Sequence, residues 1–313
     1  MIADARSQSY SDLWESQFKE TVRSRLRRWG LGLGYALMPK RISLVPRLLL
    51  MTVTYWLKPR RSRDLLPEHP VYYGPRGLIG VSNDLSVETV LARYRRGWFP
   101  ICHIGPMKWW CPEERAVISP SELRIDKGVR RLLRQKSFFV TFDEDFSAAM
   151  TACATPRPGK TPLTWITPQI MRAFWELHEA GYAHSVEVWD NDSRLVAGLY
   201  GLAIGGVFFA ESRFARADNA SKLAVTILHH HLAAWGFGIR DAKWISPQLA
   251  ALGFRSVSRA DFNTMLEEYA FKPSLVGRWE IDQTLDTANW DGGRADLVAE
   301  RVGAKGNSER RSA

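Results

Sequence analysis

The chain has 313 residues, enough to bury a sizeable core in one large or two smaller domains. Its 45% hydrophobic and 24% charged residues are ordinary for a soluble globular protein, and its three cysteines, which lack CxxC spacing, exclude a disulfide framework and a four-cysteine zinc site. The net charge of +10 and the pI of about 9.7 indicate a polyanionic partner, either nucleic acid or an anionic membrane.

The positive charge is concentrated near the N-terminus. Residues 1–70 hold 13 Lys and Arg against 6 Asp and Glu, a net charge of +7. The rest of the chain has a net charge of only +3, so the pI overstates the case that it binds RNA. The odd number of cysteines fits a reducing cytosol, and the first 20 residues are polar and acidic, unlike a signal peptide.

Two segments of this basic extension have an amphipathic or apolar character. Residues 11–29 predict a helix with an apolar stripe, surrounded by basic residues. Residues 44–57 are strongly apolar, but they are too short to span a bilayer, which takes ~20 residues. Residues 11–57 could therefore contact a membrane peripherally, or pack against the rest of the protein.

A globular pattern of mixed strands and helices begins near residue 76, after a basic segment that contains several prolines. Strands are expected at 138–142, 184–189, 194–204, 207–211 and 239–244, with helices at 85–94, 121–135, 146–154, 168–180, 220–235, 247–252 and 261–269. Hairpins with interleaved helices indicate an α+β fold. The tail from residue 286 is polar and is expected to be disordered.

The segment 207–222 offers the clearest candidate site. An apolar run ends at Glu211, and a carboxylate so close to buried apolar surface needs a partner or a function. Asp218, Asn219 and Ser221 follow as candidate N-caps of the next helix. A strand, an exposed acid and a capped helix form a ligand-facing edge; a plain strand-to-helix turn with a surface Glu is the alternative.

Two further side-chain types were considered as binding groups. Trp98, Trp109, Trp110 and Trp165 fall in loop-like positions, where they could stack on nucleobases or simply pack in the core. The three consecutive histidines 229–231 point to different sides of a helix, so no metal site is predicted.

The chain resembles the leucyl/phenylalanyl-tRNA–protein transferases over roughly residues 76–275. The matching segments, in family order, are Asp84-Leu-Ser86, Arg96-Gly-Trp-Phe-Pro100, Trp109-Trp-Cys-Pro112, Arg115-Ala-Val117, Thr164-Trp-Ile-Thr167, Leu177-His-Glu-Ala-Gly181, Ala183-His-Ser-Val-Glu-Val-Trp189, Gly198-Leu-Tyr-Gly201, Glu211-Ser212, Asn219-Ala-Ser-Lys222 and Leu252-Gly253.

This resemblance implies an α+β fold with a small N-terminal domain at 71–114 and a larger acyltransferase domain of the GNAT type, with a mixed central sheet, at 115–285. Residues 1–70 would be an additional extension, and 286–313 a tail. The implied reaction moves Leu or Phe, with Met as a third candidate, from aminoacyl-tRNA to the N-terminal Lys or Arg of proteins and marks them for degradation. The implied enzyme is a cytoplasmic monomer that needs no cofactor and no metal.

The resemblance also implies roles for individual residues. Asp241 matches the catalytic acid, and Glu211 would face the acceptor or the tRNA 3′ end. The residues implied to bind the 3′ end and the aminoacyl group are Trp165, Trp109, Trp110, Ser212, Asn219 and Ser221. The tRNA backbone would meet the basic helix through Lys127, Arg130, Arg131 and Arg134.

Several positions depart from the family pattern. Lys243 stands where the family has Gln, and it could form an ion pair with Asp241. Ile101 replaces an aromatic residue, and Arg213 replaces Met. Two alternatives therefore stay open: a diverged member with another acyl donor or a membrane-associated acceptor, and a binding module without enzyme activity.

Overall fold

The computed structural model describes residues 20–39, 41–59, 63–67, 75–156 and 162–292, and the chain divides into two compact units. The N-terminal unit comprises residues up to Arg93, Trp98–Cys111 and Ala154–Glu176; the C-terminal unit comprises Tyr94–Gly97, Pro112–Cys153 and the chain from Leu177 onward. The helix predicted at 11–29 lies partly outside the described residues, and its visible part continues to Ala36.

From residue 20, where the described residues begin, the N-terminal unit has two helices followed by a small antiparallel sheet of order β1-β3-β2. Its helices are α2 (Val22–Ala36), α3 (Val45–Leu57), α4 (Val87–Tyr94) and most of α7 (Pro168–Glu179); its strands are β1 (Leu78–Val81), β2 (Phe99–Pro100) and β3 (Lys108–Trp110). Short 3-10 turns cover Ile42–Leu44 and Pro75–Gly77. The prediction that Trp109 and Trp110 lie in a loop is wrong, because both belong to β3.

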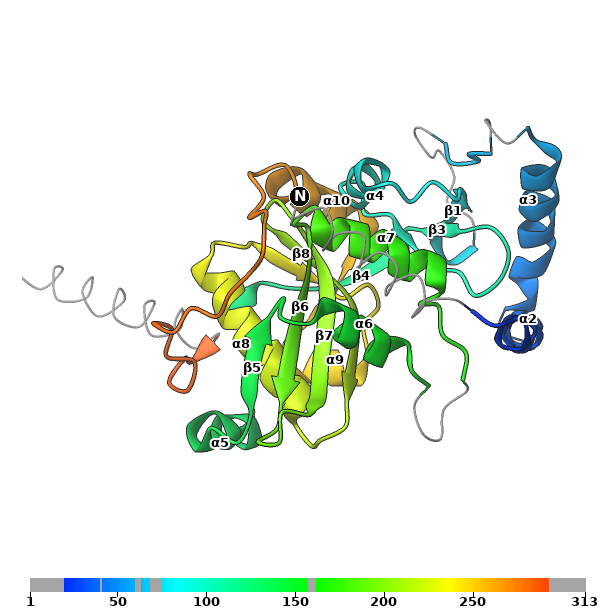
Figure 1. The fold of residues 1–313 in the computed structure, drawn as a ribbon. Helices are drawn as coiled ribbons and strands as arrows, with labels where there is room; N and C mark the ends of the chain where they lie inside the picture. Colours follow the sequence, from blue (N-terminus) through cyan, green and yellow to red (C-terminus); the bar gives the residue numbers. More distant parts are fainter. Residues whose placement is uncertain (1–19, 40, 60–62, 68–74, 157–161, 293–313) are drawn as a thin grey trace, which may run out of the picture. The chain divides into compact units, whose positions relative to one another are not determined.

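The C-terminal unit is built on a seven-stranded mixed sheet of order β10-β4-β9-β8-β7-β6-β5 (Figure 1). The strands are β4 (Glu114–Ile118), β5 (Phe139–Phe142), β6 (Ala183–Trp189), β7 (Leu195–Ile204), β8 (Val207–Ala215), β9 (Ile239–Asp241) and β10 (Arg255–Ser258). All neighbouring pairs are antiparallel except β8 and β9. The mixed α+β architecture expected from the sequence is confirmed at this level.

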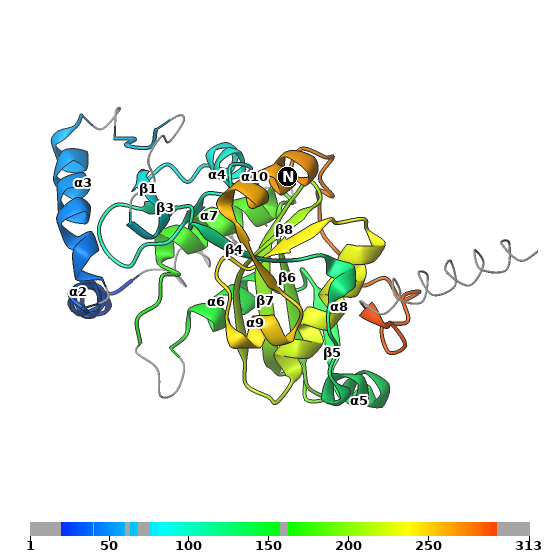
Figure 2. The same cartoon turned by 180° about the vertical axis from the view of Figure 1, so that it is seen from behind.

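Helices cover both faces of this sheet. They are the 3-10 turn Pro120–Glu122, α5 (Lys127–Gln135), α6 (Phe146–Ala154), α8 (Ala220–Ala234), α9 (Pro247–Ala251) and α10 (Arg259–Tyr269) (Figures 1 and 2). The main core forms where α8 packs on Leu199 and Phe208. Neighbouring residues in a strand point to opposite faces, so Tyr200, whose ring contacts Phe146 of α6, lies on the other face.

The polar segment after residue 285 is ordered as far as residue 292. Trp290 stacks on His230 with ring centroids 4.7 Å apart, and Asp291 pairs with Arg130 at 2.9 Å. The expectation of disorder from residue 286 is therefore wrong for 286–292, because these side chains find partners on the C-terminal unit; residues 293–313 lie outside the described residues. Within the part of the chain that is described, no helix combines the length and apolarity needed to cross a membrane.

Candidate functional site

A cluster of buried charged side chains lies on the face of the sheet opposite α8, where β9 lies between β4 and β8. Asp241 is the last residue of β9, as the sequence predicted, and its side chain has 0% exposure. Arg115 on β4 is 1% exposed and donates two hydrogen bonds to this carboxylate, Nε to Oδ1 at 3.0 Å and Nη2 to Oδ2 at 2.6 Å. The bidentate partner of Asp241 is thus Arg115, whereas the ammonium of Lys243, which the sequence suggested could pair with Asp241, forms its ion pair with Glu211.

The guanidinium of Arg115 is itself fixed in place by its surroundings. Its Nη1 donates to the carbonyl oxygen of Gly97 at 2.6 Å, and the ring of Phe262 lies 4.3 Å from the guanidinium carbon. A buried ion pair is stable only when its remaining donors and acceptors are satisfied. The backbone N–H of Lys243 meets part of this requirement by donating to Asp241 Oδ1 at 3.1 Å.

The side chain of Glu211 is fully buried, so the prediction of an exposed acid at this strand is wrong. Its Oε1 lies 2.7 Å from the Lys243 ammonium and accepts a hydrogen bond from the Tyr94 hydroxyl at 2.8 Å. Its Oε2 is buried and has no hydrogen-bond partner among the described residues. Glu211 is buried because it lies in an apolar strand. The positive charge that compensates for burying its carboxylate comes from Lys243, 32 positions later in the chain.

The position of Glu211 in β8 is set by a β-bulge. Tyr200 pairs with Ser212 and Gly201 pairs with Ala210, so Glu211 is the extra residue between two regular pairs. A bulge locally changes the direction of a side chain and is common beside active sites. Gly201 is required opposite the bulge, because a Cβ there would lie 2.4 Å from the carbonyl oxygen of Phe209.

Burial shifts the pKa values of Glu211, Lys243 and Tyr94 in the direction that favours their uncharged forms. The pKa of Glu211 is raised by burial, against the opposing effects of Lys243 and Tyr94. Burial lowers the pKa of Lys243, and it raises that of Tyr94 well above its usual value. Burial therefore shifts the pKa values of Glu211 and Lys243 toward each other.

Lys243 has a backbone conformation that few non-glycine residues adopt. Its φ is +65°, in the left-handed region, directly after β9 ends. Its ammonium also donates to the carbonyl oxygen of Ala210 at 2.8 Å, so the side chain is held on β8 and beside Glu211. Strained backbone of this kind persists where the surroundings over-determine it, often at functional sites.

The sequence-predicted aromatic residues lie in the N-terminal unit and differ in exposure. Trp109 is 0% exposed, its indole N–H donates to Ser82, and the Arg93 guanidinium lies 4.5 Å from its ring, so it is a core residue. Trp110 is half-buried and donates to Ile101. Trp165 is half-buried in the turn before α7, so it and Trp110 are the two partly accessible indoles among the three predicted to bind the tRNA 3′ end.

The other predicted binding residues lie in the C-terminal unit. Ser212 is half-buried and directly follows Glu211. Asn219 begins α8 with a φ of +59° but forms no side-chain capping hydrogen bond, and Ser221 lies in the first turn. The sequence therefore located the helix start correctly, whereas the expected capping by Asn219 is absent.

The predicted backbone-binding helix α5 is basic on its outer surface. Lys127, Arg131 and Arg134 are exposed, while Arg130 is partly buried by its ion pair with Asp291. Asp126 caps the helix by accepting from the N–H of Val129. Three of the four predicted cations are thus accessible to a phosphate backbone.

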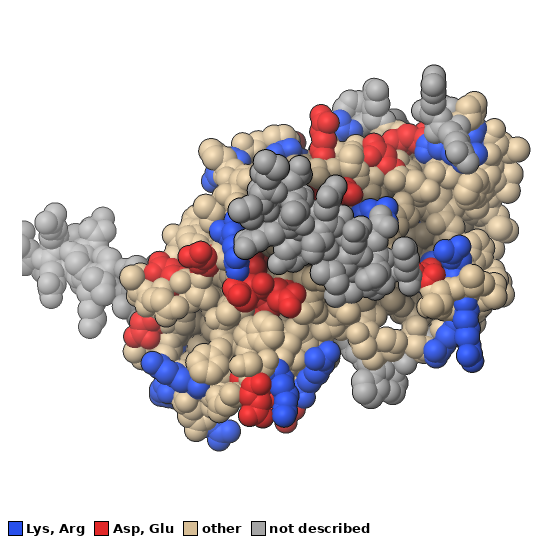
Figure 3. All heavy atoms as spheres, viewed as in Figure 1, with Lys and Arg blue, Asp and Glu red and all other residues tan. Residues whose placement is uncertain are grey.

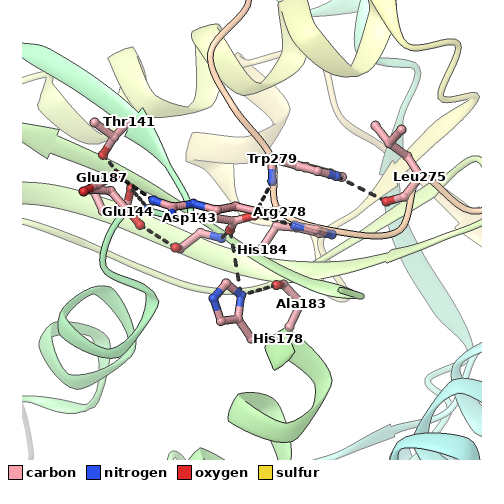
Figure 4. A network of polar contacts seen from close by, with 11 residues as sticks. Thr141, Asp143, Glu144, His178, Ala183, His184, Glu187, Leu275, Arg278 and Trp279 are labelled. Carbon is pink, nitrogen blue, oxygen red and sulfur yellow. Dashed lines mark hydrogen bonds and ion pairs between the residues drawn. The ribbon is translucent and has the colours of Figure 1, made fainter. Parts of the chain in front are cut away.

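A second buried polar network lies at β5 and β6 in the same unit (Figure 4). Asp143 accepts hydrogen bonds from the backbone N–H groups of Ser185 and Trp279, both at 2.8 Å, and contacts His184, whose ring stacks on Trp279. Glu187 accepts from Ser185 and, at 2.6 Å, from Thr141, yet burial raises its pKa to about 7. This network attaches the segment around Trp279 to the sheet.

Sequence reasoning missed two members of the charged cluster. Arg115 was noted only as part of a matching segment, although a charged residue within the apolar strand Arg115-Ala-Val-Ile118 was a signal for a buried partner. Tyr94 carried no such signal, since an aromatic residue at the end of an amphipathic helix reads as an ordinary core position.

Comparisons with known proteins match both parts of the chain to one family. The model of the leucyl/phenylalanyl-tRNA protein transferase N-terminal domain matches residues 83–113, and that of the leucyl/phenylalanyl-tRNA protein transferase matches residues 117–267. A solved structure, that of L-PGS from Bacillus licheniformis, aligns with a TM-score of 0.29 at 12% identity over 56% of this chain and 55% of that chain, which is too weak to assign the fold.

Curated relatives carry the same family name. The leucyl/phenylalanyl-tRNA–protein transferase of Pseudomonas fluorescens is 46% identical over 72% of this chain and 98% of its own length. Those of Azotobacter vinelandii and Thiobacillus denitrificans are 45% and 42% identical, over 69% of this chain and 96% and 94% of their own lengths. On this similarity, the chain belongs to the leucyl/phenylalanyl-tRNA–protein transferase family.

Proposed function

We propose that this protein transfers leucine or phenylalanine, with methionine as a third donor, from aminoacyl-tRNA to the N-terminus of acceptor proteins. Family membership supports this reaction. The single observation that carries the assignment to a site is the buried carboxylate Glu211 held between Lys243 and Tyr94, beside the ion pair of Asp241 and Arg115.

The reaction joins an amine to an ester carbonyl. The α-amino group of the acceptor forms a C–N bond, the ester C–O bond breaks, and the ribose hydroxyl leaves with a proton. The attacking amine must be neutral, yet its reference pKa near 7.7–8.0 leaves much of it protonated. A carboxylate at the site can orient the amine and take up its proton, which needs no cofactor or metal because the ester is already activated.

The hydrogen bonds suggest different roles for the two acids. Both oxygens of Asp241 are engaged by Arg115, which supports a role in fixing the geometry of the catalytic centre. Glu211 retains one oxygen without a hydrogen-bond partner among the described residues and has a raised pKa, which supports it as the group that meets the amine. An acidic side chain there would also favour acceptors that begin with Lys or Arg. Such added residues would mark the acceptor for degradation.

The tRNA is proposed to bind through two regions. The exposed cations of α5 support contacts with its phosphate backbone, so binding should weaken with rising salt. The half-buried Trp165 is the indole best suited to stack on the terminal adenosine. The mixed sheet with its parallel β8–β9 pair supports a GNAT-type fold, and the tRNA substrate supports a cytoplasmic location. The monomeric state stays a prediction.

The experiment is transfer from leucyl-tRNA to a peptide that begins with Arg, followed by mass spectrometry. We expect product with the intact protein and a loss of at least about 100-fold in rate for both Asp241→Asn and Glu211→Gln. Asp192→Asn, on an exposed surface ion pair, is the matched control and should retain full rate. Circular dichroism confirms that each variant is folded. Full turnover by both site variants would refute the assignment of the centre.

A second candidate is a diverged member with another acceptor or acyl donor, and Lys243 favours it. Its ammonium already pairs with Glu211, so less negative charge remains to attract an acceptor that begins with Arg. This candidate predicts that the intact protein is poor on an Arg-initiated peptide and that Lys243→Gln improves the rate by at least about ten-fold. High activity of the unaltered protein on that peptide would remove the candidate.

A further inference from the structure

The helices α2 and α3 expose a large amount of apolar surface. Of the eighteen large apolar side chains that are exposed among the described residues, twelve lie between Val22 and Leu57. Their exposed fractions run from 46% to 80%. Soluble proteins seldom expose so many large apolar side chains within one segment of the chain unless something binds them.

The exposed residues form one stripe on each helix. On α2 the spacing of three or four places Leu26, Trp29 and Leu33 on the same face, and on α3 it does so for Leu50, Val53 and Leu57. We call the exposed stripes of α2 and α3 the outer faces of these helices.

The opposite face of each helix is attached to the N-terminal unit, so the exposure of the outer faces is a result of defined packing. A Cβ on Gly32 would lie 2.7 Å from Ile104, and the Tyr35 ring meets His103 edge-on at 5.1 Å. On the other helix, Tyr55 is 4% exposed. The outer faces are therefore exposed because the opposite faces of the two helices pack against the N-terminal unit.

The charge around these faces is mostly positive. Residues 20–64 contain eleven Lys and Arg against two acids, Glu20 and Asp64, and Glu20 is paired with Arg28 at 2.8 Å. Arg23 and Arg27 are exposed and lie one position after the apolar residues Val22 and Leu26. Figure 3 shows Lys and Arg side chains over α2, next to an uncharged surface over α3. A partner for this surface must accept apolar side chains and carry negative charge.

We propose that the outer faces of α2 and α3 bind the surface of an anionic phospholipid bilayer. The two helices have 15 and 13 residues, shorter than the ~20 needed to span, so they would lie in the plane of the interface. Leucine and valine enter the acyl boundary, Trp29 and Trp56 lie at headgroup depth, and the arginines pair with lipid phosphates. This inference does not rest on the proposed transferase reaction.

Two other partners fit the same surface less well. The phosphates of RNA could form ion pairs with the arginines. RNA has no apolar region comparable to lipid acyl chains in which aliphatic side chains such as Leu50 and Leu57 could be buried. A second copy of this chain could cover the apolar faces, but it would bring two equally basic surfaces together. A lipid surface alone meets both the apolar and the electrostatic requirement.

The test is co-sedimentation of the full-length protein with vesicles. We expect binding to phosphatidylcholine vesicles that contain about 30% phosphatidylglycerol, and weaker binding to pure phosphatidylcholine. Raising the salt from roughly 0.1 M to 0.5 M should weaken the binding to the anionic vesicles. Absence of binding to both vesicle types would overturn the proposal.

The apolar contribution is tested with Leu50→Ser combined with Leu57→Ser. Their side chains are 68% and 80% exposed, so the fold should be kept while vesicle affinity falls by at least about ten-fold. The matched control is Phe139→Ser combined with Phe271→Ser, exposed by 63% and 67% on the other unit, which should bind like the unaltered protein. Equal loss in both variants, or in neither, would contradict the proposal.

The charged contribution is tested with two matched pairs. Arg23→Gln with Arg27→Gln should lower vesicle affinity by about ten-fold or more and leave tRNA affinity unchanged. Arg131→Gln with Arg134→Gln on α5 should do the reverse. If the α2 pair weakens tRNA binding and not vesicle binding, the surface belongs to RNA. A second copy of the chain is the partner under a different pair of results. Sedimentation analysis would then show a dimer that the variant Leu50→Ser with Leu57→Ser dissociates, and the protein would not bind vesicles.

Discussion

The C-terminal unit buries charge, whereas the helices α2 and α3 of the N-terminal unit expose apolar surface. In the first region Arg115, Asp241, Glu211 and Lys243 are at most 5% exposed. In the second, leucines and tryptophans are about half exposed or more. Both regions reverse the usual distribution of polar and apolar groups.

The two reversals differ in their cost. Buried charges are stable only as a complete set of partners, so each member depends on the others. Exposed apolar side chains change the free energy of unfolding little, because they are in contact with water in both the folded and the unfolded chain. The comparison predicts that variants in the cluster change stability strongly and that variants on the outer faces of α2 and α3 hardly change it.

Arg115→Met is expected to have the largest effect. It leaves the Asp241 carboxylate buried without its charged partner, and we expect a loss of about 4 kcal/mol in the free energy of unfolding, measured by urea denaturation. The control is Arg255→Met, whose ion pair with Glu122 is half-exposed and should contribute under about 1 kcal/mol. Equal effects of the two would mean that the buried pair has no special role.

Lys243→Met should cost somewhat less, about 3 kcal/mol, because Glu211 keeps its hydrogen bond from Tyr94 and can take up a proton. The raised pKa of Glu211 would rise further without the ammonium, since the lysine is the first factor that lowers it. A raised pKa favours the folded state at low pH, so the variant should lose more stability at pH 8 than at pH 5. Urea denaturation at both pH values would detect this difference; a pH-independent loss would argue against it.

Glu187→Gln tests a buried acid outside the proposed site. Burial raises the pKa of Glu187 to about 7 from its usual value of 4.5, so the folded state binds one more proton than the unfolded state between these two pH values. Stability should therefore decline as pH rises from about 4.5 to 7. The variant should flatten this decline and be more stable than the unaltered protein at pH 8 by about 2 kcal/mol, with transfer activity retained. An unchanged pH profile would show that Glu187 does not titrate in this range.

Leu50→Ser with Leu57→Ser should have the smallest effect on stability, within about 0.5 kcal/mol per site. Thermal unfolding in the absence of lipid provides the measurement. A substantial loss of stability would mean that these side chains pack against protein and that the comparison between the two regions fails.

Local pattern was enough to predict much of the fold. The hairpin of β7 and β8 and the helix α8 were placed within a few residues, because alternation and helical spacing are local signals. The strands β1, β4 and β10 were missed. They are short, and their pairing partners lie far away in the sequence, so their extended conformation is decided by the sheet that they join.

The sequence by itself determined which chemistry-bearing residues this protein has: an acid after an apolar strand at Glu211, another at the end of β9, and a basic extension with apolar stripes. Only the tertiary structure decided their partners. Arg115 binds Asp241 across 126 positions of sequence, and Lys243, two residues beyond the end of β9, forms its ion pair with Glu211 on β8. Ion-pair partners depend on which strands lie side by side and in which register, and burial then makes each pairing obligatory.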